Sequence, residues 1–168
     1  ITAAKNEVKY IGPCIDSIVA QVIRPKLWLV VDDGSIDGTT EIINSACESH
    51  RFIRTVRLSS SQERTFGAKV KVLQRACEVI KGEDFDFLGN LDADITLPPD
   101  YYQKMLGAMS EAEDLGIVSG VVYEPIRGSY RRTVSGLNHA VGAVQFFRRE
   151  CFEAIGGYCN VTVAGEDS

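Results

Sequence analysis

The chain has 168 residues, 45% of them hydrophobic and 24% charged, which suits one globular domain with its own core. A formal net charge of −5 and a pI of about 5.1 argue against a nucleic-acid partner, because such proteins usually carry a basic face. No apolar run approaches the roughly 20 residues of a membrane span, and no signal peptide is visible.

Short apolar runs alternate with amphipathic segments along the first two thirds of the chain. The expected helices are 11–22, 39–50, 66–80, 98–113 and 148–158, and the expected strands are 26–35, 51–58, 84–92 and 116–123. Asp37 is the expected N-cap of the second helix, and Pro98 and Pro99 are expected to start the fourth. This alternation predicts an α/β fold, a mostly parallel twisted sheet with helices on both faces.

In such sheets, ligands bind beyond the carboxyl ends of the strands. Both acidic clusters of the sequence, VVDDGS and NLDAD, fall at the end of a predicted strand. Their placement therefore predicts a ligand site at one edge of the sheet.

The second cluster, Asp92-Ala93-Asp94, allows three interpretations. Residues two apart on a strand point to one face, so Asp92 and Asp94 can share a hard cation such as Mg²⁺ or Mn²⁺. The pattern Asp-x-Asp-x-Thr also fits haloacid-dehalogenase-type phosphatases, with Asp92 as nucleophile and Asp94 as general acid. Against that, the motif lies far from the first strand, and Ile95 replaces the usual Gly. The third interpretation is a solvated acidic turn.

The first cluster, VVDDGSIDGTTEII, resembles the beginning of a calcium-binding EF-hand loop. The twelfth position is Asn44, however, where that loop needs a bidentate Glu, so the calcium interpretation is rejected. The segment instead predicts a strand, a turn and a helix, and its end can accept hydrogen bonds from a base or ribose. No GxGxxG motif follows a strand, so a dinucleotide-binding turn is missing.

Four stretches carry a resemblance to a known family. AAKNEVKYIGPCIDSIVAQ, LVVDDGSIDGTTEII, LGNLDADITLPPDYYQKML and FFRRECFEAIGGY with AGED follow in the order and approximate spacing of the family 2 glycosyltransferases of GT-A fold. The resemblance implies an inverting, hexosyltransferase-type transfer of a sugar from a UDP- or GDP-type donor to an acceptor hydroxyl. It also implies Mg²⁺ or Mn²⁺ as cofactor and a saccharide or lipid-linked acceptor, as in polysaccharide or glycolipid biosynthesis.

The resemblance also assigns residues. The residues expected to bind the donor nucleotide are Ala3, Ala4, Glu7, Asp33, Ser35, Lys69, Asp92 and Ala93. Asp33 matches the base contact, whereas Asp32 is expected to be structural. Asp94 is the expected main metal ligand, with Asp92 beside it. Ala3 replaces the family's usual Pro and Lys5 its usual aromatic residue, which leaves open what covers the base.

Asp167, after Glu166 in AGED, matches the family's catalytic base, and an acidic tail is the alternative interpretation. His139 is expected to be a loop residue. The arginines that could bind an anionic acceptor or a lipid phosphate, or be solvated, are Arg127, Arg131, Arg132, Arg148 and Arg149. A nucleotide-sugar binding domain without turnover remains an alternative to an enzyme.

The remaining expectations concern the ends and the cysteines. The chain starts at Ile1 and stops after AGEDS, so we expect one catalytic domain, 1–168, truncated at both ends, whose missing segments could reach a membrane. The cysteines show no CxxC pair, which predicts buried free thiols in a reducing compartment; they are Cys14, Cys47, Cys77, Cys151 and Cys159. The expected location is cytoplasmic, with the inner face of the membrane as a possible site.

Overall fold

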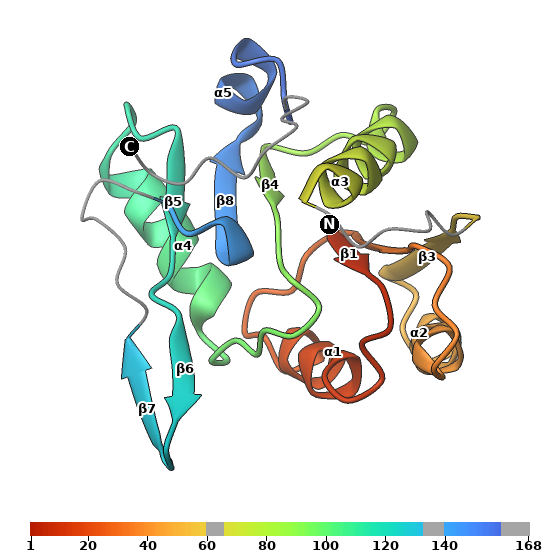
Figure 1. Cartoon of the computed structure of the whole chain (residues 1–168). Helices are drawn as coiled ribbons and strands as arrows, with labels where there is room; N and C mark the ends of the chain where they lie inside the picture. The colour runs from red at the N-terminus through yellow and green to blue at the C-terminus, as the bar shows by residue number, and fades with distance from the viewer. Residues whose placement is uncertain (60–65, 133–139, 159–168) are drawn as a thin grey trace.

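The computed structural model describes residues 1–59, 66–132 and 140–158 (Figure 1). In chain order the elements are β1 (Thr2–Ala4), α1 (Ile11–Val19), β2 (Trp28–Asp32), α2 (Thr39–Ser49), β3 (Ile53–Arg57), α3 (Phe66–Ile80), β4 (Phe87–Gly89), α4 (Tyr101–Glu111), β5 (Ile117–Ser119), β6 (Tyr123–Ile126), β7 (Ser129–Arg132), the 3₁₀ turn η1 (Gly142–Val144), β8 (Gln145–Arg148) and α5 (Arg149–Ala154). The expected alternation of strands and helices is confirmed through β5.

One twisted sheet organises the domain. Strands β1, β2 and β3 pair in parallel, and Thr2 lies opposite Val30. The amide of Leu91 donates to the carbonyl of Ile1 and the backbone nitrogen of Ile1 donates to the carbonyl of Gly89, which joins β1 to β4 in the alternating pattern of parallel strands. Strand β8 is antiparallel to β4 and to β5, so β4 and β5 run in the same direction. The mostly parallel sheet is therefore confirmed, with β8 as its reversed strand within the described ranges.

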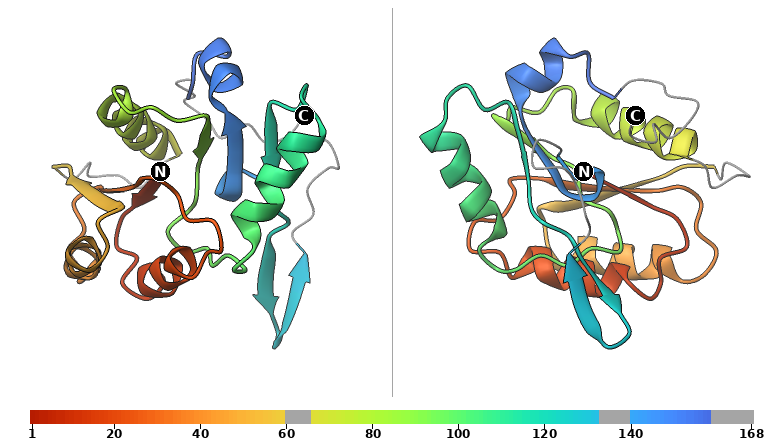
Figure 2. Two further views of the ribbon diagram at one scale, coloured as in Figure 1. Left: turned by 180° about the vertical axis from the view of Figure 1, so that it is seen from behind. Right: turned by 60° about the vertical axis from the view of Figure 1, so that its left-hand side comes forward.

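Helices cover both faces of this sheet, with α1 and α2 on one side and α3 and α5 on the other (Figures 1 and 2). All five residues of β2 are buried. Trp28 and Val30 pack with α1 and α2, whereas Leu29 and Val31 pack with α3. Alternate side chains of β2 therefore point to opposite faces of the sheet, which divides the core into two layers. Because both faces are covered, the β2 sequence is a continuous apolar run. Trp28, 3% exposed, is a core residue.

Several element boundaries differ from the expectation. Helix α1 ends at Val19 rather than at residue 22, and α4 begins at Tyr101. The two prolines form the turn before α4, since the carbonyl of Pro98 accepts from the amide of Tyr101. Gly38 is the N-cap of α2, at φ 101°, in place of Asp37. The Asp37 carboxylate nevertheless accepts from the amide of Thr39 at 3.1 Å, so it still satisfies a first-turn donor.

Strands β6, β7 and β8 and the turn η1 were not among the expected elements. The end of the predicted strand 116–123 instead starts the β6–β7 hairpin, and the residues before α5 form β8.

Cys14, Cys47, Cys77 and Cys151 are free thiols, but only Cys14 is fully buried, and Cys159 lies outside the described residues. Within those residues, no helix has both the length and the apolar content needed to cross a bilayer.

Candidate donor-binding site

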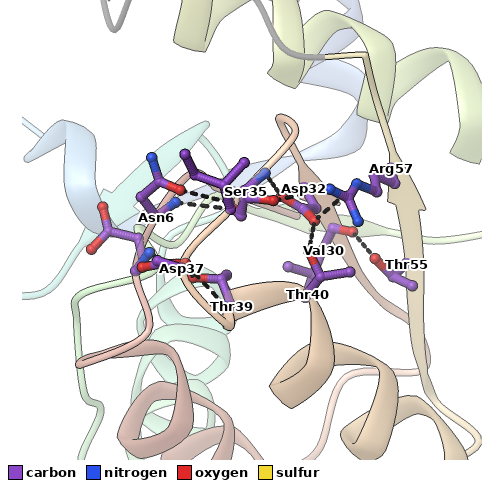
Figure 3. A network of polar contacts seen from close by, with 11 residues as sticks. Asn6, Val30, Asp32, Ser35, Asp37, Thr39, Thr40, Thr55 and Arg57 are labelled. Carbon is purple, nitrogen blue, oxygen red and sulfur yellow. Dashed lines mark hydrogen bonds and ion pairs between the residues drawn. The ribbon is translucent and has the colours of Figure 1, made fainter.

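The loops that follow β1 and β2 are tied together at the carboxyl edge of the sheet (Figure 3). The amide of Asn6 donates to Ser35 Oγ at 3.0 Å, and Asn6 Oδ1 accepts from the amide of Ile36 at 2.9 Å. Asn6 adopts a φ of 55°, a left-handed conformation that asparagine tolerates better than most residues. Ser35, one of the residues expected to bind nucleotide, thus supports this pair of loops.

Asp32 organises the turn after β2 (Figure 3). Its carboxylate accepts from the amide of Ser35 at 2.8 Å and from the hydroxyl of Thr40 at 2.6 Å. The guanidinium of Arg57 lies 3.9 Å away and also donates to the carbonyl of Ser35. Asp32 is 1% exposed, so these partners offset the cost of burying its charge. The expected structural role of Asp32 therefore agrees with its surroundings.

A cavity of about 130 Å³ lies at this edge, beyond the carboxyl ends of β1, β2 and β4. Residues far apart in the sequence line it together: Ala3, Ala4, Lys5, Glu7, Asp33, Ala68, Lys69, Val72, Asp92, Ala93 and Asp94. Every expected donor-binding and metal-binding residue except Ser35 is in this lining. The position beyond the strand ends is the one expected for a ligand site in an open α/β sheet.

Lys5 and Asp33 form an ion pair in the cavity wall. Lys5 Nζ lies 3.0 Å from Asp33 Oδ2, and the two side chains are 16% and 9% exposed. The amide of Asp33 also donates to the carbonyl of Ala4, so adjacent strands fix both residues. Lys5, which stands where the family usually has an aromatic residue, therefore lines the cavity as part of an ion pair. The sequence did not predict this pair, because it depends on the register between two strands.

Lys69 and Asp92 form a second ion pair on the other side of the cavity. Lys69 Nζ lies 2.5 Å from Asp92 Oδ1, with side chains 34% and 25% exposed. Lys69 therefore points from helix α3 toward the acidic cluster. The backbone of Asp92 has a further contact, because its carbonyl accepts a weak hydrogen bond from the thiol of Cys14. Burial, with the nearby charges of Asp94 and Asp92, raises the pKa of that thiol to about 12.

The acidic cluster suits a metal ion whose coordination shell is completed by the substrate. Asp94 is exposed and lines the cavity, whereas Asp92 is engaged by Lys69. Over the part of the chain that is described, no three His, Cys, Asp or Glu side chains gather as a metal cage. Mg²⁺ and Mn²⁺ do not need such a cage, because one or two carboxylates suffice when water and phosphate oxygens complete the shell. The donor set is therefore suited to a cation held between Asp94 and a diphosphate.

Some expected residues cannot be placed. Asp167, Glu166 and His139 lie outside the described residues. Arg148 does not face the cavity: its guanidinium donates to the carbonyls of Leu115 and Met109 and so joins β8 to the end of α4. Arg149 forms an ion pair with Glu153.

The sheet order and the reversed β8 match the GT-A fold, which two solved structures share. A mannosyltransferase from Pyrobaculum calidifontis, solved with GDP-Man and Mn²⁺, superposes with a TM-score of 0.69 at 20% identity, covering 95% of this chain and 46% of the other. TarS 1–349 of S. aureus, solved with UDP, gives a TM-score of 0.72 at 19% identity, covering 94% and 48%.

The family model described as Glycosyl transferase family 2 matches residues 1–158, so the chain belongs to that family. The β-monoglucosyldiacylglycerol synthase of Synechocystis sp. is 24% identical over 99% of this chain and 38% of its own length. The poly-β-1,6-N-acetyl-D-glucosamine synthase of Staphylococcus epidermidis is 23% identical over 99% and 43%. The chain thus spans less than half the length of these relatives.

Proposed function

We propose that this chain carries the donor-binding and catalytic centre of an inverting, metal-assisted glycosyltransferase. The observation that carries the proposal is the convergence of Asp33, Asp92 and Asp94 on one cavity beyond the strand ends, in a member of family 2. The relatives solved with GDP-Man and Mn²⁺ or with UDP support a nucleotide-diphosphate donor.

The proposed roles are those that the family resemblance assigns, and the cavity lining is consistent with them. Asp33 accepts hydrogen bonds from the base, while Ala3, Ala4 and Glu7 form the nucleoside side of the cavity. Asp92 and Ala93 lie on the ribose side, and Lys69 offsets negative charge at the diphosphate. Asp94 is the ligand of Mg²⁺ or Mn²⁺, which when bound stabilises the charge that develops on the departing diphosphate.

The acceptor hydroxyl needs a base on the face opposite the leaving group, and Asp167 is proposed for it. One displacement then inverts the anomeric centre, and no covalent nucleophile is needed. The names of the relatives support a lipid or polysaccharide acceptor. The phosphatase interpretation of Asp92 gains no support, because the family match includes that motif.

The test is binding of UDP and GDP by calorimetry, with and without Mn²⁺, followed by donor turnover. Binding that Mn²⁺ strengthens, together with release of free sugar from the donor when no acceptor is present, supports the proposal. Binding without any hydrolysis or transfer would favour a nucleotide-sugar binding domain instead.

A further inference from the structure

The β6–β7 hairpin extends from the body of the domain, away from the packed layers (Figures 1 and 2). It is a separate two-stranded sheet, and all eight of its strand residues are exposed. An isolated hairpin gains little from its own two strands. Its exposed side chains are therefore a surface available to a partner.

The chemistry of this surface is both basic and amphipathic. Residues 123–132 contain Arg127, Arg131 and Arg132 against the single acid Glu124, three positive charges minus one, in a chain whose net charge is −5. Tyr123, Tyr130 and Ile126 are 58%, 76% and 41% exposed. The hairpin therefore combines positive charge with exposed rings and an aliphatic side chain.

Strand register distributes these side chains over both faces. Tyr123 lies opposite Arg132 and Pro125 opposite Tyr130, which gives one face two tyrosines and an arginine. Ile126 and Arg131 lie on the other face. On that second face Glu124 lies directly opposite Arg131, so the face with Tyr123, Tyr130 and Arg132 carries the unopposed positive charge of the strands.

The tip holds an arginine in an unfavourable backbone conformation. Arg127 has a φ of 49° and Gly128 a φ of 80°, both positive as in type I′ turns, where Asn or Asp ordinarily precedes Gly. Left-handed backbone is disfavoured for a long side chain. An arginine at this position places a cation at the end of the hairpin in spite of that cost.

We propose that the hairpin docks on an anionic phospholipid surface. Tyrosine rings favour the boundary between headgroups and acyl chains, while arginines attract acidic headgroups and extend toward them. The basic patch is confined to residues 123–132, whereas a nucleic acid ordinarily meets an extended basic face.

The hairpin lies on the same edge of the sheet as the cavity, and this placement does not depend on the proposed function. Because β4 and β5 run in the same direction, their carboxyl ends lie at one edge of the sheet. Asp92 and Asp94 follow β4, and the hairpin follows β5. A surface bound at the hairpin therefore lies on the cavity's edge of the sheet.

The test is co-sedimentation of the chain with vesicles of phosphatidylcholine alone, or of phosphatidylcholine mixed with an equal part of phosphatidylglycerol. We expect binding only to the acidic vesicles, reversed by high salt. The variant R127E/R131E/R132E should lose at least about tenfold in partitioning. The control R51E/K71E/K81E makes the same change of charge at exposed positions elsewhere and should lose much less. Tyr130→Ser should weaken binding while leaving every charge in place.

Absence of vesicle binding, or equal losses in the two triple variants, would overturn the proposal. Equal affinity for soluble polyphosphate, unaffected by Tyr130→Ser, would identify a general anion patch and overturn it as well. Dimerisation that light scattering detects and the hairpin variant abolishes would make the hairpin a contact between copies instead. None of these measurements involves nucleotide or turnover, so they are independent of the proposed glycosyltransferase activity.

Discussion

Lys69 of helix α3 and Asp92 after strand β4 form an ion pair in the cavity lining, with Nζ 2.5 Å from Oδ1. The pair joins an amphipathic helix to the acidic motif across more than 20 residues of sequence. It holds one carboxylate of the motif and leaves the other, Asp94, exposed at the cavity. This division explains how two acids two residues apart can have different roles.

Replacing Lys69 with Met should weaken nucleotide diphosphate binding about fivefold, roughly 1 kcal/mol, because a partly exposed cation contributes modestly. Calorimetry with UDP and GDP in the presence of Mn²⁺ measures this change. Lys71→Met, at an exposed position of the same helix, is the matched control. Unchanged affinity in Lys69→Met would show that the ammonium serves Asp92 alone.

Asp94→Ala should abolish the strengthening of nucleotide binding by Mn²⁺ while leaving some metal-independent binding, because the nucleoside contacts remain. The measurement is the ratio of dissociation constants with and without the metal. Asp114→Ala removes an exposed carboxylate elsewhere and should keep the wild-type ratio. A ratio that Asp94→Ala leaves intact would remove this residue from the metal site.

Asp32→Ala should destabilise the fold rather than the chemistry. The substitution leaves the buried amide of Ser35 and the hydroxyl of Thr40 without their acceptor. We expect a loss of about 3 kcal/mol in the free energy of unfolding, and roughly 6–12 °C in Tm. Thermal unfolding followed by circular dichroism checks this, with the exposed Asp16→Ala as control. A stable Asp32→Ala protein that fails to bind nucleotide would reverse the roles given to Asp32 and Asp33.

How far the sequence predicted this architecture depends on the element. Strand β2 is buried on both faces and reads as a continuous apolar run, whereas α3 is buried on one face and reads as an amphipathic pattern. These local patterns were sufficient to predict both elements. The β6–β7 hairpin is exposed on both faces and shows no burial pattern. Strand β8 is only four residues long and runs directly into α5, so Phe146 and Phe147 were left outside every expected element.

The site was predictable in part for a similar reason. Asp33, Asp92 and Asp94 stand at strand ends, and parallel strands bring such ends to one edge. The partners of these acids were not predictable, because Lys5 reaches Asp33 through strand register and Cys14 reaches Asp92 from a helix beneath it. The contact of Ser35 was not predictable either, because its hydroxyl accepts from the amide of Asn6 in the neighbouring loop.

Cys14 gives a prediction for pH. Burial raises its pKa from 9.0 to about 12, so the thiol contributes its full stability below pH 9, where both the folded and the unfolded chain are protonated. Between pH 9 and 12 the unfolded chain releases this proton and the folded chain does not, so the free energy of unfolding falls as pH rises. Urea titrations of Cys14→Ala should therefore show a shallower fall in that window than the wild type. Rapid alkylation of native Cys14 at neutral pH would contradict its burial.

Asp167→Asn should preserve donor binding and reduce transfer by about 10²–10⁴-fold, because the amide cannot take the proton of the acceptor hydroxyl. Calorimetry with the nucleotide and Mn²⁺ measures the first quantity, and turnover with a saccharide or lipid acceptor measures the second. Glu166→Gln is the matched control, since it removes the neighbouring charge and should keep most of the transfer rate. Loss of transfer in Glu166→Gln with retention in Asp167→Asn would move the base by one residue. Retention in both would place the proton acceptor elsewhere in the chain.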